Sequence, residues 1–372
     1  MVPRRALVVT FDRLPATILG CYGNEWIETP QLDRLASAGL VADQCFAARV
    51  GPQSSEEAFA AGAATSRCRQ QALQSVLFQE SGAQVDFSTA GFDHVETLTG
   101  DGTAASKPDT IPLAVLVRAA LVATQSTEPP SDRPLEQRLT GGLSWVHARG
   151  LELPATPPAG FAELYHDEFE DRGVQFDQLS ESEQQHHPLV AAGMMSLFDH
   201  WLGELIRPYA GSSDLPTLIV VAAAQGNGWQ PLPNSLGALD DLRGQAVQTP
   251  LIVRAMHDER FAGMSGLRTS ALLSTADLGL LLDWWFQGDV VSTGDFPAWI
   301  ARHQRGRLLT HGAQGACRVS TVDWGAIFPP SAEESVRPAL FHKPEDAWEV
   351  NNVAETAREV VETLRSALNC AS

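Results

Sequence analysis

Three stretches at the start of the chain decide its fold: RALVVTFDR at residues 5–13, LGCYG at 19–23 and TPQLDRLASAG at 29–39. The segment 6–11 is apolar and rich in β-branched residues, which is typical of a buried parallel strand. Asp12 stands where that strand ends, and in open α/β sheets ligands bind at the carboxyl ends of the strands. Thr29 and Pro30 suit the start of a helix, and Gly39 suits its end. This order predicts the opening of an α/β enzyme fold.

These stretches resemble the opening of the sulfatase family, within the alkaline-phosphatase-like superfamily. That family begins with an apolar strand that ends in acidic metal ligands. A Leu-Gly-Cys-Tyr-Gly-like segment and a Thr-Pro-Asn-Leu-Asp-Arg-Leu-Ala-like helix follow. Residues 19–23 and 29–36 match it closely, with Gln31 in place of the usual asparagine. Further landmarks of the family lie at Asp199 and at residues 250–254, 274–278 and 344–354.

The resemblance implies an α/β fold with a large mixed, mostly parallel sheet between helices and a small C-terminal α+β subdomain. We expect the sulfatase-like domain at residues 1–290 and the smaller subdomain, packed on it, at 291–372. Buried strands parallel to the first are predicted at 217–223 and 248–254, and a hairpin within 318–328. Helices are predicted at residues 71–79, 111–123, 190–205, 278–288 and 354–367, and a short strand at 84–88.

Composition narrows the classes of function. The 372 residues are 44% hydrophobic and 19% charged, which is ordinary for a globular protein with a large core. The net charge of −19 argues against a nucleic-acid partner or an anionic membrane surface. Only two lysines occur, Lys107 and Lys343, so a basic site must rely on arginine or histidine.

The cysteines and the apolar runs suggest a compartment. Five cysteines, an odd number without metal-ligand spacing, predict reduced thiols rather than a disulfide framework or a zinc site. No apolar run approaches the ~20 residues that cross a membrane, and the first strand begins too early for a signal peptide. We therefore expect a soluble, cytoplasmic protein, unless a leader has been removed.

A sulfatase needs a nucleophile at a helix N-terminus, and this segment departs from the family motif. Residues 59–62 resemble the family's Leu-Leu-Thr-Gly, which places Pro52 at the nucleophile position and Glu56 at the motif arginine. A two-residue shift would bring Ser54 to the nucleophile position, and Ser55 keeps the motif serine. Glu56 would still oppose an anionic ester. We favour Ser54 or Ser55 as a cap of the following helix over either as a nucleophile.

The metal site of the family is also incomplete. Asp12 matches the first carboxylate ligand, but Arg13 occupies the second position. After the predicted strand 217–223, Ala224 and Gln225 replace an aspartate and a second ligand. One carboxylate and one amide beside an arginine do not provide the six to eight oxygens that Ca²⁺ takes. We expect no metal and no other cofactor, with Asp12 as a remnant ligand that contacts an arginine.

The groups that would hold the sulfate depart from the family as well. Residues 88–92 stand where the family often has Lys-x-His. Residues 145–154 resemble its histidine-containing strand and the turn after it, but Glu152 replaces the turn histidine. His147 lies on the strand, and Arg149 could stand in for a lysine.

The departures from the family at the nucleophile, the metal ligands and the sulfate-binding groups occur together. Removing one such catalytic group typically lowers the rate of an enzymatic reaction by orders of magnitude. The sequence predicts a sulfatase-like pseudoenzyme that has lost sulfuric-ester hydrolase activity and binds a small anion or a protein partner. The alternative is a divergent hydrolase of sulfate or phosphate esters. It would use Ser54 or Ser55 with Asp12, His147 and Arg149, and a divalent cation such as Ca²⁺. A third possibility is a stabilising partner of an active family member.

Overall fold

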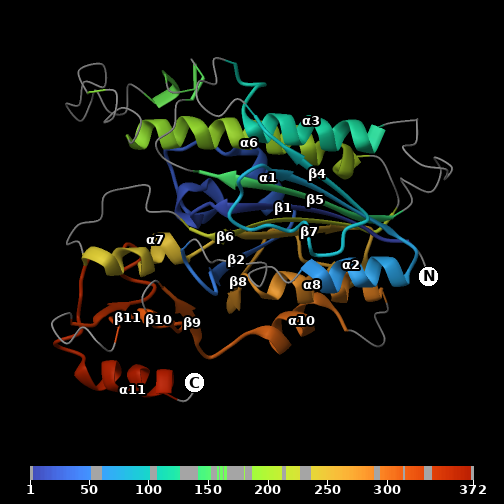
Figure 1. The fold of residues 1–372 in the computed structure, drawn as a ribbon. Helices are drawn as coiled ribbons and strands as arrows, with labels where there is room; N and C mark the ends of the chain where they lie inside the picture. The colour runs from blue at the N-terminus through green and yellow to red at the C-terminus, as the bar shows by residue number, and fades with distance from the viewer. Residues whose placement is uncertain are drawn as a thin grey trace.

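Two sheets and the helices around them make up the described part of this computed structural model (Figure 1). It describes residues 3–51, 61–100, 107–125, 141–151, 157–158, 160–161, 163–165, 180, 187–211, 215–226, 236–288, 294–312, 315–330 and 337–369. An eight-stranded mixed sheet lies between helices, and a four-stranded antiparallel sheet follows it. The predicted fold class is confirmed. Within the described residues, no helix is long and apolar enough to cross a membrane.

The first strand forms the centre of the large sheet. In spatial order the strands are β4 (His94–Leu98), β3 (Gln74–Glu80), β5 (Gly142–Gly150), β1 (Arg5–Arg13), β6 (Thr217–Gln225), β7 (Leu251–Met256), β2 (Leu40–Phe46) and β8 (Leu267–Ser274). β1 runs parallel to both neighbours, with Val8 opposite Trp145 and Val220. A strand in this position is covered on both faces, which explains why its sequence is apolar without alternation.

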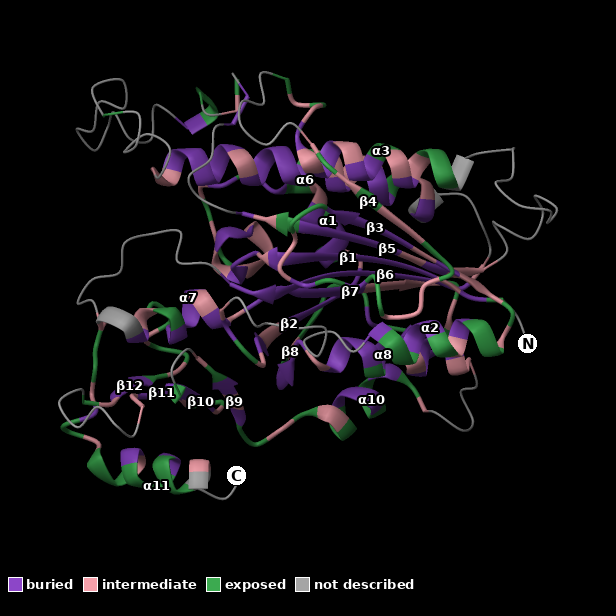
Figure 2. Ribbon diagram, in the orientation of Figure 1, coloured by how far each residue is buried: buried purple, intermediate pink, exposed green. Residues whose placement is uncertain are grey.

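Helices cover both faces of this sheet (Figures 1 and 2). One face carries α1 (Pro30–Ser37), α3 (Pro112–Gln125) and α6 (Pro188–Gly211), and the other carries α2 (Ala61–Gln70), α8 (Asp277–Gln287) and α10 (Phe296–His303). Leu7 and Val9 of β1 pack into the first core, and Ala6 and Val8 into the second. This alternation places Asp12 on the same face as Ala6 and Val8.

Three predicted elements differ from the structure. Residues 71–79 were expected as a helix, but β3 occupies most of them, because it pairs with β5 and buries Leu77 and Phe78 in the cores on opposite faces of the sheet. Residues 84–88 form no strand. β7 is antiparallel to β6 and β2 rather than parallel. The chain between β6 and β7 returns to the same edge, where the Gly226 N–H bonds the Ala246 carbonyl, so the next strand must run backwards.

The small subdomain contains the second sheet and the last helix. Its elements are β9 (Leu308–His311), β10 (Cys317–Ser320), β11 (Trp324–Phe328), β12 (Ala339–His342) and α11 (Arg358–Asn369). β10 and β11 form the predicted hairpin. Val361 and Leu364 of α11 pack against Phe328 and Leu340 of the sheet. The domain boundary at residue 290 stays a prediction, although α10 packs on the large sheet.

Short helices connect the larger elements. They are η1 (Ala16–Ile18), η2 (Gly20–Tyr22), η5 (Glu163–Tyr165), η7 (Gly237–Leu242), α7 (Gly244–Val247) and η8 (Glu259–Phe261). η1 and η2 follow β1 at the carboxyl edge of the sheet, and α7 lies where the large sheet meets the small subdomain (Figure 1).

The N-terminus of α1 is capped from another helix. Thr29 occupies the N-cap position, but its side chain makes no capping bond. Instead the buried carboxylate of Asp199, on α6, accepts the N–H of Gln31 (2.9 Å) and of Leu32 (2.8 Å). A negative charge at a helix N-terminus is favourable, so Asp199 joins α1 to α6 by both hydrogen bonds and charge.

We expect Asp199→Ala to lower the free energy of unfolding by about 2–4 kcal/mol, because two backbone donors each lose a partner at a cost of about 1–3 kcal/mol. Urea unfolding at neutral pH measures this change. Asp323→Ala, at an exposed residue, is the matched control and should change it by less than about 0.5 kcal/mol. Equal stability of the two variants would contradict the capping role of Asp199.

A buried carboxylate joins the small subdomain to the large domain. Glu349, 1% exposed, contacts Arg318 (2.6 and 3.1 Å) and Lys343 (2.9 Å) and accepts the N–H of Gly244 (2.8 Å). A side chain at Gly325 would collide with the Arg318 guanidinium, so this glycine makes room for the pair. Burial alone would raise the pKa of Glu349, but the two cations outweigh it and lower that pKa to about 2.

This pKa shift predicts a pH dependence of stability. The unfolded pKa, about 4.5, lies above the folded one, so the stabilisation of about 3 kcal/mol is complete above pH 4.5 and is lost as pH falls towards 2. Glu349→Gln should lower the free energy of unfolding at neutral pH by about 3–5 kcal/mol. Urea unfolding should show that the difference in free energy of unfolding between wild type and Glu349→Gln becomes smaller as pH falls from 4.5 towards 2.

Glu355→Gln is the control for this experiment, because Glu355 is exposed and its ion pair in the described part of the chain is with the exposed Arg337. Its difference from wild type should stay small at every pH. A gap for Glu349→Gln that stays constant down to about pH 3 would contradict the assignment.

Candidate functional site

The sheet brings the predicted site residues of three strands to one edge. β1 ends with Asp12 and Arg13, β6 ends with Gln225, and β5 carries His147 and Arg149 near its end. Because β1 pairs with both β5 and β6, Arg13 lies opposite Gln225. This edge is where an α/β fold places its ligands.

The carboxylate of Asp12 accepts hydrogen bonds from three donors. Its Oδ2 accepts the backbone N–H of Gln84 (2.6 Å), and its Oδ1 accepts the N–H of Val85 (2.9 Å) and the Nε2–H of His147 (3.1 Å). The side chain is 1% exposed. We expected an arginine as the partner of Asp12, and the structure shows two backbone amides and an imidazole instead.

A chain of hydrogen bonds extends from Asp12 into the core. Trp145 Nε1 donates to Thr10 Oγ1 (2.7 Å), and Thr10 Oγ1 contacts His147 Nδ1 (2.9 Å). A carboxylate only accepts, so His147 Nε2 carries the proton towards Asp12, and a neutral ring then accepts the Thr10 hydroxyl proton at Nδ1. Each donor in this series of hydrogen bonds, from Trp145 to Asp12, therefore has an acceptor.

An acid, a histidine and a hydroxyl hydrogen-bonded in this order also occur at nucleophilic catalytic sites. The position of these three groups in the core, however, does not suit catalysis. Thr10, His147 and Trp145 are fully buried. The centroid of the Phe87 ring lies 4.9 Å from the ring centroids of both Trp145 and His147. A nucleophile must reach its substrate. The chain of bonds is therefore structural. Thr10 was missed in the sequence, although strand alternation places it on the same face as Asp12.

The remaining positions at this edge offer few ligand groups. Gln225 uses both ends of its amide, accepting from the Gly51 N–H (3.0 Å) and donating to Gln84 Oε1 (3.2 Å). Ala224 is buried in the apolar core. Arg13 Nε is buried and has no hydrogen-bond partner among the residues that the structure describes. The backbone N–H of Arg149 donates to Glu80 (2.8 Å).

Five of the predicted positions lie outside the described residues: Pro52, Ser54, Ser55, Glu56 and Glu152. Of the set proposed for a hydrolase, the structure brings Asp12 and His147 into contact. Arg149, two residues further along β5, has an exposed side chain.

The described residues at this edge do not fit the divalent cation that the fold family implies. Asp12 directs its oxygens to N–H donors, Arg13 brings a positive charge, and Ala224 has no donor atom. Within the described ranges, no three His, Cys, Asp or Glu side chains come together to hold a metal ion.

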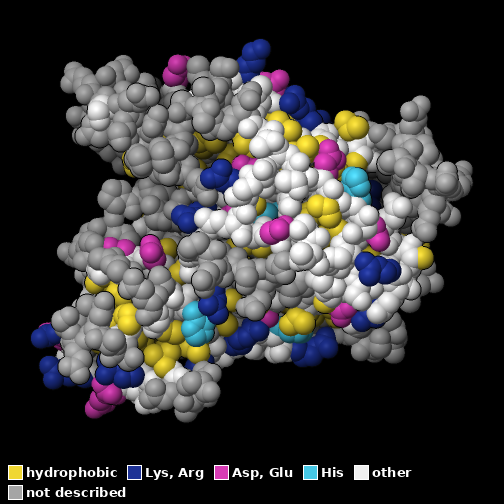
Figure 3. Space-filling view, viewed as in Figure 1, with side chains coloured by type: hydrophobic (Ala, Val, Ile, Leu, Met, Phe, Trp, Pro, Cys, Tyr) yellow, Lys and Arg dark blue, Asp and Glu magenta, His cyan; other side chains and the backbone are white. Residues whose placement is uncertain are grey.

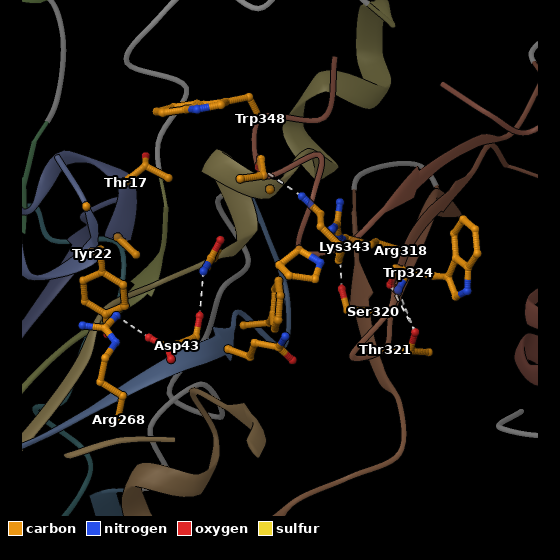
Figure 4. Close-up of a pocket in the computed structure, with 18 residues that line it drawn as sticks. Thr17, Tyr22, Asp43, Arg268, Arg318, Ser320, Thr321, Trp324, Lys343 and Trp348 are labelled. Carbon is orange, nitrogen blue, oxygen red and sulfur yellow. Dashed lines mark hydrogen bonds and ion pairs between the residues drawn. The ribbon is translucent and has the colours of Figure 1, made fainter. Parts of the chain in front are cut away.

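A cavity of about 390 Å³ lies between the large sheet and the small subdomain (Figure 4). Its lining shares no residue with the bonds around Asp12. Its polar and aromatic lining includes Thr17, Tyr22, Asp43, Gln44, Gln248, Arg268, Arg318, Thr321, Lys343 and Trp348.

Solved structures show the same fold over nearly the whole chain. The phosphonate monoester hydrolase of Agrobacterium radiobacter is 13% identical, with a TM-score of 0.67 over 99% of this chain and 95% of that one. The enzyme of the same name from Silicibacter pomeroyi is 15% identical, with a TM-score of 0.65 over 99% and 94%. A Bacteroides fragilis protein assigned to the sulfatases is 13% identical, with a TM-score of 0.65 over 99% and 94%.

At sequence identities of 13–15%, the likeness to these structures shows a shared fold and nothing about activity. The chain has the sulfatase and alkaline-phosphatase-like fold, as its opening stretches imply. No protein-family model matches the sequence, and the comparison with curated proteins finds no match.

We expect Asp12→Asn to lower the free energy of unfolding by about 2–4 kcal/mol, because an amide nitrogen would face a backbone N–H of Gln84 or Val85 and leave buried donors unpaired. Urea unfolding measures the change, and hydrogen exchange of these two amides should accelerate. Asp323→Asn, at an exposed position, should leave both quantities unchanged. Unaltered exchange at residues 84 and 85 in Asp12→Asn would contradict this assignment.

Proposed function

We propose that this chain is a sulfatase-fold protein that has lost sulfuric-ester hydrolase activity and acts by binding. The observation that carries the proposal is the carboxylate of Asp12, which would be the first metal ligand. Its oxygens are held by the Gln84 and Val85 amides and by His147. Hydrolysis in this fold depends on a metal that polarises the ester and activates the nucleophile.

The charge at this edge supports a small anion as the bound partner. Arg13 stands where the family has its second carboxylate, and no described residue accepts a hydrogen bond from its Nε. A guanidinium binds carboxylate, sulfate or phosphate groups through paired N–H donors. On the face drawn in Figure 3, the described Lys and Arg side chains are scattered among acidic ones, unlike the basic stripe of a nucleic-acid-binding protein.

A cytoplasmic location is part of the proposal. The thiols of Cys21, Cys45, Cys68 and Cys317 are free, and free thiols suit a reducing compartment. Burial raises the pKa of Cys45 and Cys68 to about 12, so these thiols are poor nucleophiles and poor metal ligands.

The test is a hydrolysis assay with 4-nitrophenyl sulfate and 4-nitrophenyl phenylphosphonate, with and without Ca²⁺ or Mn²⁺. We expect no turnover above buffer for either ester, because the described edge of the sheet lacks a set of metal ligands. Metal-dependent turnover that Ser54→Ala or Ser55→Ala abolishes would overturn the proposal and establish the hydrolase alternative. Ser37→Ala, at an exposed serine of α1, is the matched control.

Thermal unfolding provides an independent measurement. A cation bound at 100 times its dissociation constant stabilises a protein by about 2.7 kcal/mol. We expect Ca²⁺ to shift Tm no more than KCl of equal ionic strength does. A shift specific to Ca²⁺ that disappears in Asp12→Ala would show that Asp12 binds metal.

A further inference from the structure

The cavity between the two sheets is bounded by both the large domain and the small subdomain. Its volume of about 390 Å³ lies within the range of small-molecule pockets, about 300–1,000 Å³. Asp43 and Arg268 enter it from β2 and β8 of the large sheet, whereas Lys343 and Trp348 belong to the turn after β12 (Figure 4). A small molecule bound here would contact both parts of the protein.

Uncharged polar groups of the lining form their hydrogen bonds within the protein. The hydroxyl of Tyr22 donates to the carbonyl of Ala42 (3.0 Å) and accepts the N–H of Leu251 (2.8 Å). Gln248 Nε2 donates to the backbone carbonyl of Asp43 (2.7 Å). Because these groups are already paired, the features that remain to select a ligand are the net charge of the walls and their aromatic rings.

The charges around the cavity do not cancel. Arg318 (2.6 and 3.1 Å) and Lys343 (2.9 Å) share the single carboxylate of Glu349, so two cations face one anion. At the opposite wall, Arg268 pairs one to one with the carboxylate of Asp43. These three cations and two carboxylates leave an excess of one positive charge, which favours a ligand with one negative charge.

The turn after β12 fixes this charge beside an aromatic ring. Lys343 Nζ donates to the carbonyls of Asp346 (3.0 Å) and Ala347 (3.1 Å), and Ala347 directly precedes Trp348. The carboxylate of Asp346 is outside the lining and accepts the backbone N–H groups of residues 350 and 351 (2.8 and 2.9 Å). The cation and the indole are therefore held together by the same set of bonds.

The indole of Trp348 provides an open aromatic face. Trp348 is 50% exposed, and its ring lies across the side of the cavity near Thr17 in Figure 4. The ring of Tyr22 belongs to the same lining, next to the guanidinium of Arg268. Aromatic rings stack on one another in offset or edge-to-face arrangements, so the exposed indole suits a ligand that carries a ring.

From these observations we propose that the cavity binds an aromatic monocarboxylate. Its ring packs on the indole of Trp348, and its carboxylate lies towards the wall that holds Arg318 and Lys343. The single negative charge of the ligand matches the single excess positive charge of the walls. This site is separate from the hydrogen bonds around Asp12 and does not depend on the loss of hydrolysis.

The test compares three probes that share a ring and a chain length and differ in charge. They are 3-phenylpropanoate, 3-phenylpropan-1-ol and 3-phenylpropan-1-amine, with hexanoate as an acid without a ring. Saturation-transfer NMR on the full chain detects binding, and calorimetry gives the dissociation constants. We expect the aromatic acid to bind in the millimolar range or more tightly, the alcohol more weakly and the amine most weakly. Hexanoate should bind more weakly than 3-phenylpropanoate.

Variants of Trp348 test the contribution of the ring. Trp348→Ala should weaken the binding of 3-phenylpropanoate about tenfold, and Trp348→Phe should retain most of the affinity. Trp348 is exposed, so thermal unfolding of both variants should match wild type. Leu280→Ala, which removes an exposed apolar side chain of α8, is the matched control and should leave the affinity unchanged.

Two variants test the contribution of charge with opposite signs. Asp43→Asn removes a carboxylate and should strengthen the binding of 3-phenylpropanoate about threefold, whereas Arg268→Gln removes a cation and should weaken it about threefold. Neither should alter the binding of 3-phenylpropan-1-ol. Arg337→Gln and Glu355→Gln remove the charges of an exposed ion pair outside the lining, so neither should change the affinity for the acid.

Several results would overturn the proposal. Saturation transfer to none of the probes at high millimolar concentration would show that the cavity takes no such ligand. Equal affinity for the acid, the alcohol and the amine would exclude selection by charge, and equal affinity for hexanoate would exclude selection by the ring. Binding that Arg13→Gln removes and Trp348→Ala leaves intact would place the acid at the edge around Asp12 instead, which separates this proposal from that of a small anion bound there.

Discussion

The position of the small subdomain depends on one buried carboxylate. Glu349 has no access to water, so it is tolerable only because Arg318, Lys343 and the Gly244 amide surround it. These partners come from the small sheet, the turn after it and the large domain. Three members of the same cluster, Gly244, Arg318 and Lys343, also line the cavity between the sheets, where Glu349 pairs with both cations. A single electrostatic requirement therefore sets the docking of the two sheets and the chemistry between them.

The fold could be predicted because its strongest signals are local. β1 is apolar on both faces since it is covered on both, and the capped helix after it has its expected bounds. Other elements depend on contacts that no local pattern contains. The residues of β3 have a spacing that suits a helix as well as a strand, and pairing with β5 decides between them. The direction of β7 depends on the path of the chain before it.

The candidate site could be predicted only in part. The hydrolase alternative grouped Asp12 with His147, and the structure brings these two into contact, but their direct hydrogen bond was not predicted, although the alternation of β1 and β5 could have indicated it. The Gln84 and Val85 donors could not be predicted, because every residue type except proline offers a backbone N–H. The cavity is equally invisible in the sequence, since Gln44, Arg268 and Trp348 are far apart along the chain and meet only after the two sheets dock.

The orientation of Asp12 has a consequence for any attempt to engineer a metal site into this chain. Arg13→Asp and Ala224→Asp would introduce two carboxylates at the strand ends, yet Asp12 would still direct both oxygens to N–H donors. To free it, the loop carrying Gln84 and Val85 would have to move, and His147 would have to find another acceptor for its proton. Metal binding at this edge would therefore require changes of side chains and backbone together.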